Sequence, residues 1–242
     1  MTNEQAQQTA NGIFKDIFGV DNPLLLEQMR SLLTEGIPLP VATKCALSGK
    51  DIFVYDPQPQ HQIISEEAYL AQMKVDGWMK ETTPMSSIDD VLGAFKSVAY
   101  MTAEKAPNSQ QIAQSDSITA SSSVFGSALI GNSKQIIFSQ NNFFSNYLLA
   151  CRGNSSCNFG IRTFDSLYCS SSFEVRWSNK VAKSFFINDA SDLFECMFCY
   201  GIRSKKYCIA NRQYSQEDYM KVKALVVEWI LKTYIPARCH FA

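Results

Sequence analysis

Residues 115–211 place the strongest constraint on the fold. This stretch is dense in serine, contains no proline and carries short apolar bursts separated by small polar residues. That pattern suits short strands and tight turns better than helices. A small polar residue precedes successive bursts at intervals of 10 to 13 positions, at Ser133, Asn146, Ser156, Ser166, Asn179, Ser191 and Ser204. Every second marker lies about 20–25 residues further on, a spacing typical of solenoid coils. We therefore predict a β-solenoid over 115–214, with apolar residues facing inward and Ser, Asn and Gly at the corners.

The N-terminal region, residues 1–106, shows helical patterns interrupted by one hairpin. Segment 3–18 is rich in helix formers, and a second helix with Asn22 as its cap is expected to end at Gly36. Two prolines then exclude a helix, and a Ser-Gly-Lys turn shortly after Cys45 joins two apolar stretches as a hairpin would.

Two more helices are expected between residues 65 and 105, followed by a linker. Ser65 caps the first, and the second has its apolar residues on one face, at Ile88, Val91, Leu92, Phe95, Val98 and Ala99. A last amphipathic helix, residues 215–235, begins at the cap Ser215 and is expected to end at Pro236. Because an open solenoid end exposes apolar core, we expect this helix to cap it. The predicted fold class is α+β.

Composition and charge limit the function classes. The chain has 22 basic and 23 acidic residues, a formal net charge of −1, and scattered basic residues, so no broad surface for nucleic acid is expected. The nearest basic cluster, Arg203, Lys205 and Lys206, is typical of a solvated turn. No early segment resembles a signal peptide and no apolar run approaches the ~18 residues of a membrane span. We expect a soluble protein that is not exported by a standard signal.

The cysteines recur with the apolar bursts. Cys157 and Cys169 are 12 residues apart, as are Cys196 and Cys208, which indicates small interior side chains spaced by half a coil. Cys199 departs from this interval and forms a C-x-x-C pair with Cys196. A zinc site or a redox pair therefore remains an alternative. The weak metal candidates are Cys196, Cys199, Cys208, Cys239 and His240. Reduced structural thiols and no cofactor are the first expectation.

Catalytic motifs are sparse. The only histidines are His61 and His240, and there is no phosphate-binding Gly loop or H-E-x-x-H motif. The pair Asp89-Asp90 begins a predicted helix, where acidic residues favour the helix dipole. A solenoid-type polysaccharide lyase or hydrolase would need paired carboxylates, and the repeats offer Asp165, Glu174, Asp189, Asp192 and Glu195. We expect no catalytic residues and no enzymatic activity.

The segment CMFCYGIRSKKYCIANRQYSQEDY, residues 196–219, resembles the C-terminal signature of a family of uncharacterised Cys-rich repeat proteins from candidate-phyla bacteria and phage metagenomes, with a pattern like GLRNKKYCILNKQYSKEEY. The resemblance extends upstream and covers residues 37–80 and 120–235. The matching residues are Cys45, Gly49, Tyr55, Pro57, Trp78, Cys196, Cys199, Gly201, Tyr207, Cys208, Asn211, Gln213, Tyr214 and Tyr219. This chain departs from the family in having fewer repeat cysteines and no C-x-x-C ahead of Cys45. The resemblance implies a repeat architecture and a viral context.

These observations favour a structural or interaction protein. We expect a phage virion or assembly component, located in the virion or host cytoplasm, that presents a rigid solenoid surface to other subunits or to itself. A zinc-stabilised binding module is the first alternative and a polysaccharide-degrading solenoid enzyme is the second. Neither nucleic acid nor a membrane is an expected partner.

Overall fold

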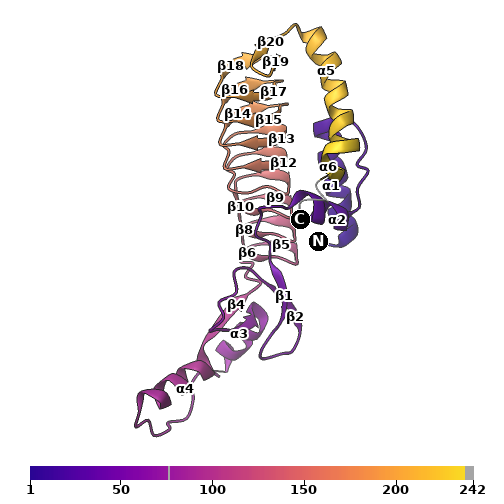
Figure 1. Cartoon of the computed structure of the whole chain (residues 1–242). Coiled ribbons are helices and arrows are strands. Elements are labelled where there is room, and N and C mark those ends of the chain that lie inside the picture. Colours follow the sequence, from indigo (N-terminus) through magenta and orange to yellow (C-terminus); the bar gives the residue numbers. More distant parts are fainter. Residues whose placement is uncertain (76, 238–242) are drawn as a thin grey trace.

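In the computed structural model, which describes residues 1–75 and 77–237, the chain is an α+β protein built around a parallel β-solenoid over residues 110–209 (Figure 1). The predicted solenoid and its C-terminal cap are confirmed. The helices are α1 (Asn3–Phe18), α2 (Leu26–Leu33), α3 (Glu66–Lys74), α4 (Ile88–Val98) and α5 (Gln216–Trp229), and α5 continues through η1 (Ile230–Tyr234) into α6 (Ile235–Ala237).

Two small sheets lie at the N-terminal end of the solenoid. Strands β1 (Val41–Lys44) and β2 (Asp51–Val54) form the predicted antiparallel hairpin, while β3 (Gln62–Ser65) pairs in parallel with β4 (Tyr100–Ala103). Helix α4 projects from this region, away from the solenoid (Figure 1).

The solenoid strands are short. They are β5 (Gln110–Ala113), β6 (Asp116–Thr119), β7 (Ser122–Phe125), β8 (Ala128–Gly131), β9 (Lys134–Ile137), β10 (Gln140–Phe143), β11 (Asn146–Leu149), β12 (Asn158–Phe164), β13 (Ser170–Arg176), β14 (Asn179–Ala182), β15 (Phe185–Asn188), β16 (Ser191–Phe194), β17 (Met197–Tyr200), β18 (Arg203–Lys206), β19 (Cys208–Ile209) and β20 (Arg212–Gln213). All pairs within this sheet are parallel except the β19–β20 hairpin.

One coil contains 12 residues. Gln110 pairs with Ser122, and Ser122 pairs with Lys134, so each strand lies beside the strand 12 positions further on. The expected coil of about 20–25 residues is therefore wrong, and the interval taken for half a coil is a complete one. So short a coil is closed by sharp corners: every third residue from Asn108 to Ala210 has a positive φ.

Each coil has four sides of three residues, and each side has an interior residue, an outward-facing residue and a left-handed corner. The coil Gly160–Ser171 shows this as Gly-Ile-Arg, Thr-Phe-Asp, Ser-Leu-Tyr and Cys-Ser-Ser, where the first residue of every group is buried. A left-handed non-glycine residue costs ~1–2 kcal/mol. The ladder of hydrogen bonds between coils offsets this cost.

Serine and asparagine fill many interior positions in addition to corners, where the expectation placed them. The amide N–H of Ser127 donates to Ser115 Oγ at 3.0 Å, and Ser127 Oγ donates to the Phe125 carbonyl at 2.9 Å. Ser139 repeats both bonds one coil further on. These hydroxyls can lie inside the solenoid because each one donates and accepts a hydrogen bond. Corners carry small residues such as Ser123, Gly126 and Asn132, and also large residues such as Phe138 and Trp177.

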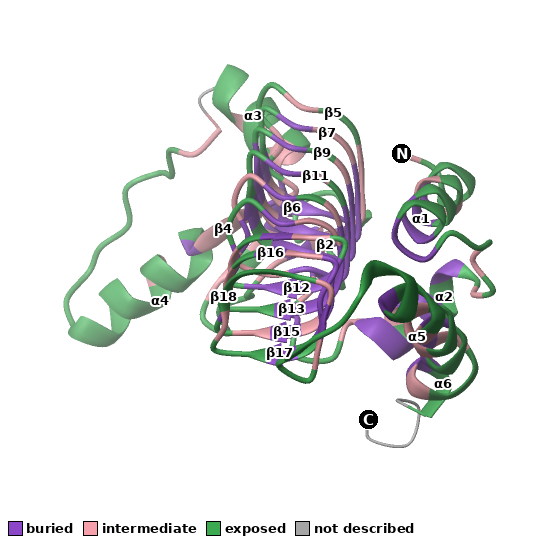
Figure 2. Cartoon of the chain, turned by 90° about the horizontal axis from the view of Figure 1, so that it is seen from above, coloured by how far each residue is buried: buried purple, intermediate pink, exposed green. Residues whose placement is uncertain are grey.

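One side of the solenoid, which we call the covered wall, is buried under the terminal helices. Its outward-facing apolar residues form one core with α1, α2 and the C-terminal helix, and they are Phe125, Ile137, Leu149, Ile161, Phe173, Phe185 and Met197. Figure 2 shows α1, α2, α5 and α6 together on this side of the coils. The cap helix therefore starts at the last coil and returns along the covered wall.

Two predicted helix boundaries differ from the structure. Helix α2 starts at Leu26 rather than near Pro23, because the Asn22 side chain accepts a hydrogen bond from the Leu24 amide instead of capping a helix. Pro236 lies inside α6 rather than ending the last helix.

Candidate interaction surface

Six cysteines lie in the solenoid, and all occupy interior positions as buried free thiols: Cys151, Cys157, Cys169, Cys196, Cys199 and Cys208. Since every third residue faces inward, Cys196 and Cys199 both point into the core. The C-x-x-C pair follows from this period of three. Cys199 therefore fits the repeat, and the expectation that it departs from the repeat is corrected.

The thiols take the place of serine hydroxyls. Cys199 Sγ donates to the Met197 carbonyl at 3.2 Å, as Ser139 Oγ does to the Ile137 carbonyl at 2.8 Å. Burial raises the pKa of Cys151 to about 12. The hydrogen bond to Cys199, followed by burial, raises the pKa of Cys196. The same hydrogen bond lowers the pKa of Cys199 to about 7. Cys151 and Cys196 therefore stay protonated, whereas zinc binds thiolates, and this argument does not extend to Cys199.

No group of three or more His, Cys, Asp or Glu side chains in the described part of the chain is arranged to hold a metal ion. The candidates Cys196, Cys199 and Cys208 lie near one another in the last coils but donate to backbone carbonyls. Cys239 and His240 lie outside the described residues. Over the same described residues, no helix is long and apolar enough to span a membrane.

The acidic residues of the repeats do not converge on one cavity. Glu174 is buried beside Arg162, and Glu195 lies 3.7 Å from Lys223. Asp165 lies 3.7 Å from Arg152 on a corner. Asp192 lies 4.0 Å from Lys180, and Asp189 occupies a corner one coil beyond Trp177. His61 precedes β3, in the region at the N-terminal end of the solenoid.

A cavity of about 460 Å³ lies between α1, α5 and the solenoid. Its charged side chains include Asp16, Lys183, Glu195 and Lys223. Asp16 accepts a 2.6 Å hydrogen bond from Ser171, and Lys223 lies over the Phe185 ring beside Glu195. Because its lining contains two basic and two acidic groups, this cavity has no net charge with which to select an ionic ligand.

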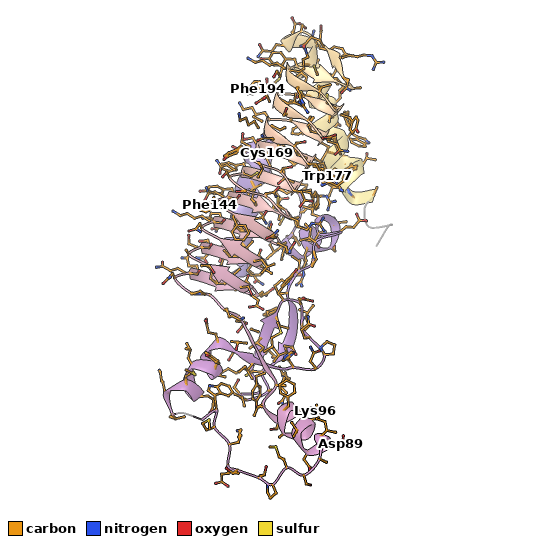
Figure 3. The ribbon with its side chains drawn as sticks, turned by 90° about the vertical axis from the view of Figure 1, so that its left-hand side faces the viewer. Asp89, Lys96, Phe144, Cys169, Trp177 and Phe194 are labelled. Atoms are coloured by element: carbon orange, nitrogen blue, oxygen red, sulfur yellow. The ribbon has the colours of Figure 1, made fainter. Side chains whose placement is uncertain are left out.

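The side opposite the covered wall, which we call the open wall, has none of the described helices over it. The two walls lie opposite each other because they are the first and third of the four sides of each coil. It exposes aromatic and aliphatic residues in two alternate coils and at the adjoining corner: Phe143, Phe144, Leu167, Tyr168 and Trp177, which are 41, 61, 45, 60 and 62% exposed. Figure 3 looks onto this wall, with Phe144 and Trp177 on its two borders.

Small serines separate the large side chains of the open wall. Ser155 and Ser156 lie in the coil between Phe143–Phe144 and Leu167–Tyr168. Neighbouring strands are ~4.8 Å apart, so Phe144 and Tyr168 stand about 10 Å apart. The ring of Phe143 also lies over Gly131, where a Cβ atom would come within 2.7 Å of it. The ladder of backbone hydrogen bonds holds this pattern rigidly.

The open wall does not follow from the predicted solenoid, although the sequence contains a signal for it. The signal is the recurrence of the apolar pairs Phe143–Phe144 and Leu167–Tyr168 after 24 residues, which is two coils. A coil of about 20–25 residues whose apolar residues all face inward has no place for such pairs on its surface. Comparison with known proteins adds no identification: no family model, no curated protein and no solved structure matches this chain.

Proposed function

We propose that this chain is a non-enzymatic structural protein whose open wall binds other protein subunits. The observation that carries the proposal is the contrast between the two walls. The terminal helices cover the apolar residues of one wall, while the opposite wall leaves five large apolar side chains in water. Exposed apolar clusters with a polar surround mark interaction sites, and aromatic residues are enriched at their centres.

The rigidity of the coils supports this assignment. The outward-facing side chains are held by parallel strands and interior hydrogen bonds, so little conformational entropy is lost when a partner binds. Solenoids generally supply extended surfaces of this kind. Assembly within a phage particle is the setting that the family resemblance implies for such a surface.

A photocrosslinking amino acid at Tyr168 tests the proposal in cells that produce the protein. We expect a discrete crosslinked protein band with the probe at position 168 and none with the probe at Glu4, an exposed position on α1. The substitutions Phe144→Ser and Trp177→Ser should then reduce the band at least severalfold, because they remove two of the large exposed apolar side chains of the contact. Equal labelling at positions 168 and 4, or a band that survives both substitutions, would show that the open wall is not an interface.

A further inference from the structure

Helix α4 is amphipathic but has no buried residue. Its apolar residues are all exposed, at Ile88 69%, Val91 46%, Leu92 49%, Phe95 55% and Val98 40%. The helix stands clear of the solenoid, at the opposite end of the molecule from the cap helix (Figure 1). An apolar stripe of this kind normally packs against another element.

The spacing of the apolar stripe is that of the contact line between two paired helices, which we call the seam. Ile88, Val91, Phe95 and Val98 follow each other at steps of three, four and three residues, and Leu92 widens the seam on one side. This is the a/d pattern of paired helices. Asp89 and Lys96 lie seven residues apart on the flank next to Leu92, so they share one face.

The charges on that flank distinguish between orientations. Consider two copies of α4 that run in opposite directions, with the centre of the contact between Leu92 and Gly93. The flank of one helix then lies beside the same flank of the other, and Asp89 of each helix faces Lys96 of the other. A parallel pair brings the acidic first turns, Asp89 and Asp90, to the same end, where like charges repel. Neither Asp89 nor Lys96 forms an ion pair within the described part of the chain. Figure 3 shows both side chains at the free end of the molecule.

We infer that α4 pairs antiparallel with α4 of a second copy of this chain, forming a two-fold dimer. The partner is a second copy because the flank is complementary to its own reverse. The contact uses a surface separate from the open wall, so it stands or fails independently of the proposed function. An 11-residue helix is ~16 Å long, and a contact of that length falls below the ~1,200 Å² of a standard interface. The dimer should therefore be weak, with a dissociation constant in the micromolar range.

Sedimentation velocity of the full chain, at concentrations from a few micromolar to several hundred, tests the inference. We expect the mass to rise from the monomer value of 27.2 kDa towards twice that value. Phe95→Glu should abolish the rise by placing a charge in the seam. Trp177→Glu, which changes the open wall to a similar extent, should leave it unchanged. Circular dichroism confirms that each variant is folded.

Charge reversal separates self-pairing from other forms of association. Asp89→Lys and Lys96→Glu should each weaken the dimer about tenfold, since each places like charges at both ends of the pair. An equimolar mixture should regain the wild-type affinity, because the lysine introduced in one variant then faces the glutamate introduced in the other, while the native Lys96 and Asp89 face each other at the opposite end. A wild-type protein that stays monomeric throughout the range, or a mixture no more associated than its two components, overturns the inference. Crosslinking at the open wall has no bearing on either outcome.

Discussion

Arg162 Nε donates a 2.5 Å hydrogen bond to Glu174 Oε1 in the next coil, and the two side chains are only 1% and 6% exposed. The same pair reaches both ends of the chain. Arg162 donates to the carbonyl of Leu33 at the end of α2, and the hydroxyl of Tyr234 donates to Glu174 Oε1 at 2.9 Å. One buried ion pair therefore joins the solenoid to the N-terminal and C-terminal helices.

Arg162→Ala should lower the free energy of unfolding by about 3–5 kcal/mol, because it leaves the carboxylate of Glu174 buried without its main counter-charge. Urea denaturation followed by circular dichroism measures the change. The double variant Arg162→Leu/Glu174→Leu should lose less than the single variant, since neither charge is then buried alone. A double variant less stable than Arg162→Ala would contradict this account.

Ser139→Ala tests the interior hydroxyl ladder. Ser139 Oγ accepts from the Cys151 amide at 3.0 Å and donates to the Ile137 carbonyl at 2.8 Å, so alanine leaves a buried N–H without a partner. We expect a loss of about 1–3 kcal/mol in the free energy of unfolding. Ser155→Ala is the matched control, because Ser155 faces outward one coil later, and its effect should stay within ~0.5 kcal/mol. Similar losses for both variants would argue against the ladder.

The sequence allowed the fold to be predicted but not its fine geometry. Apolar bursts with serine between them indicated stacked coils, and Ser215 marked the start of the cap helix. The 12-residue coil is hard to recognise in the sequence because its corners are left-handed. Glycine and asparagine are the usual signals of left-handed residues, whereas here residues such as Leu129 and Phe138 also occupy corners. The 12-residue interval from Cys157 to Cys169 equals the length of one coil.

The incorrect coil length also gives the wrong orientation, inward or outward, for several side chains. With a 12-residue coil, Ser139 falls in the interior and Tyr168 on the surface, which reverses what polarity alone suggests. A buried serine is acceptable here because neighbouring coils offer it a donor and an acceptor at fixed positions. That information lies in the three-dimensional ladder and not in the local sequence.

Cys199→Ser should change the free energy of unfolding by less than ~1 kcal/mol. The serine hydroxyl can donate to the Met197 carbonyl as the thiol does, in the same interior row where Ser127 and Ser139 occur. Cys199→Asp, which buries a charge at the same place, should destabilise by several kcal/mol. Elemental analysis completes the test: one equivalent of zinc in the wild-type protein that disappears in Cys199→Ser would support a metal site instead.

Cys45 should make folding stability depend on pH. Burial alone raises its pKa, but hydrogen bonds from the Ser48 side chain and from the backbone at Ser65, Ser48 and Leu47 lower it from 9.0 to about 7. Between pH 7 and 9 the unfolded state therefore binds more protons than the folded state, and the stabilising contribution of Cys45 rises with pH across that window. It is fully present above pH 9 and lost as pH falls through 7.

The free energy of unfolding of wild type and Cys45→Ala, measured from pH 6 to 9.5 in reducing buffer, gives this contribution as a difference. We expect the difference to grow between pH 7 and 9. Cys151→Ala is the control, since the pKa of Cys151 is raised to about 12 and its thiol stays protonated throughout the folded range. In the wild type the Cys151 thiol ionises only in the unfolded state, which lowers the stability of the wild type above pH 8.5. The stability of Cys151→Ala relative to wild type should therefore rise with pH, opposite to that of Cys45→Ala. A Cys45→Ala difference that is flat, or that shrinks with rising pH, would show that the Cys45 thiolate is not stabilised by these hydrogen bonds.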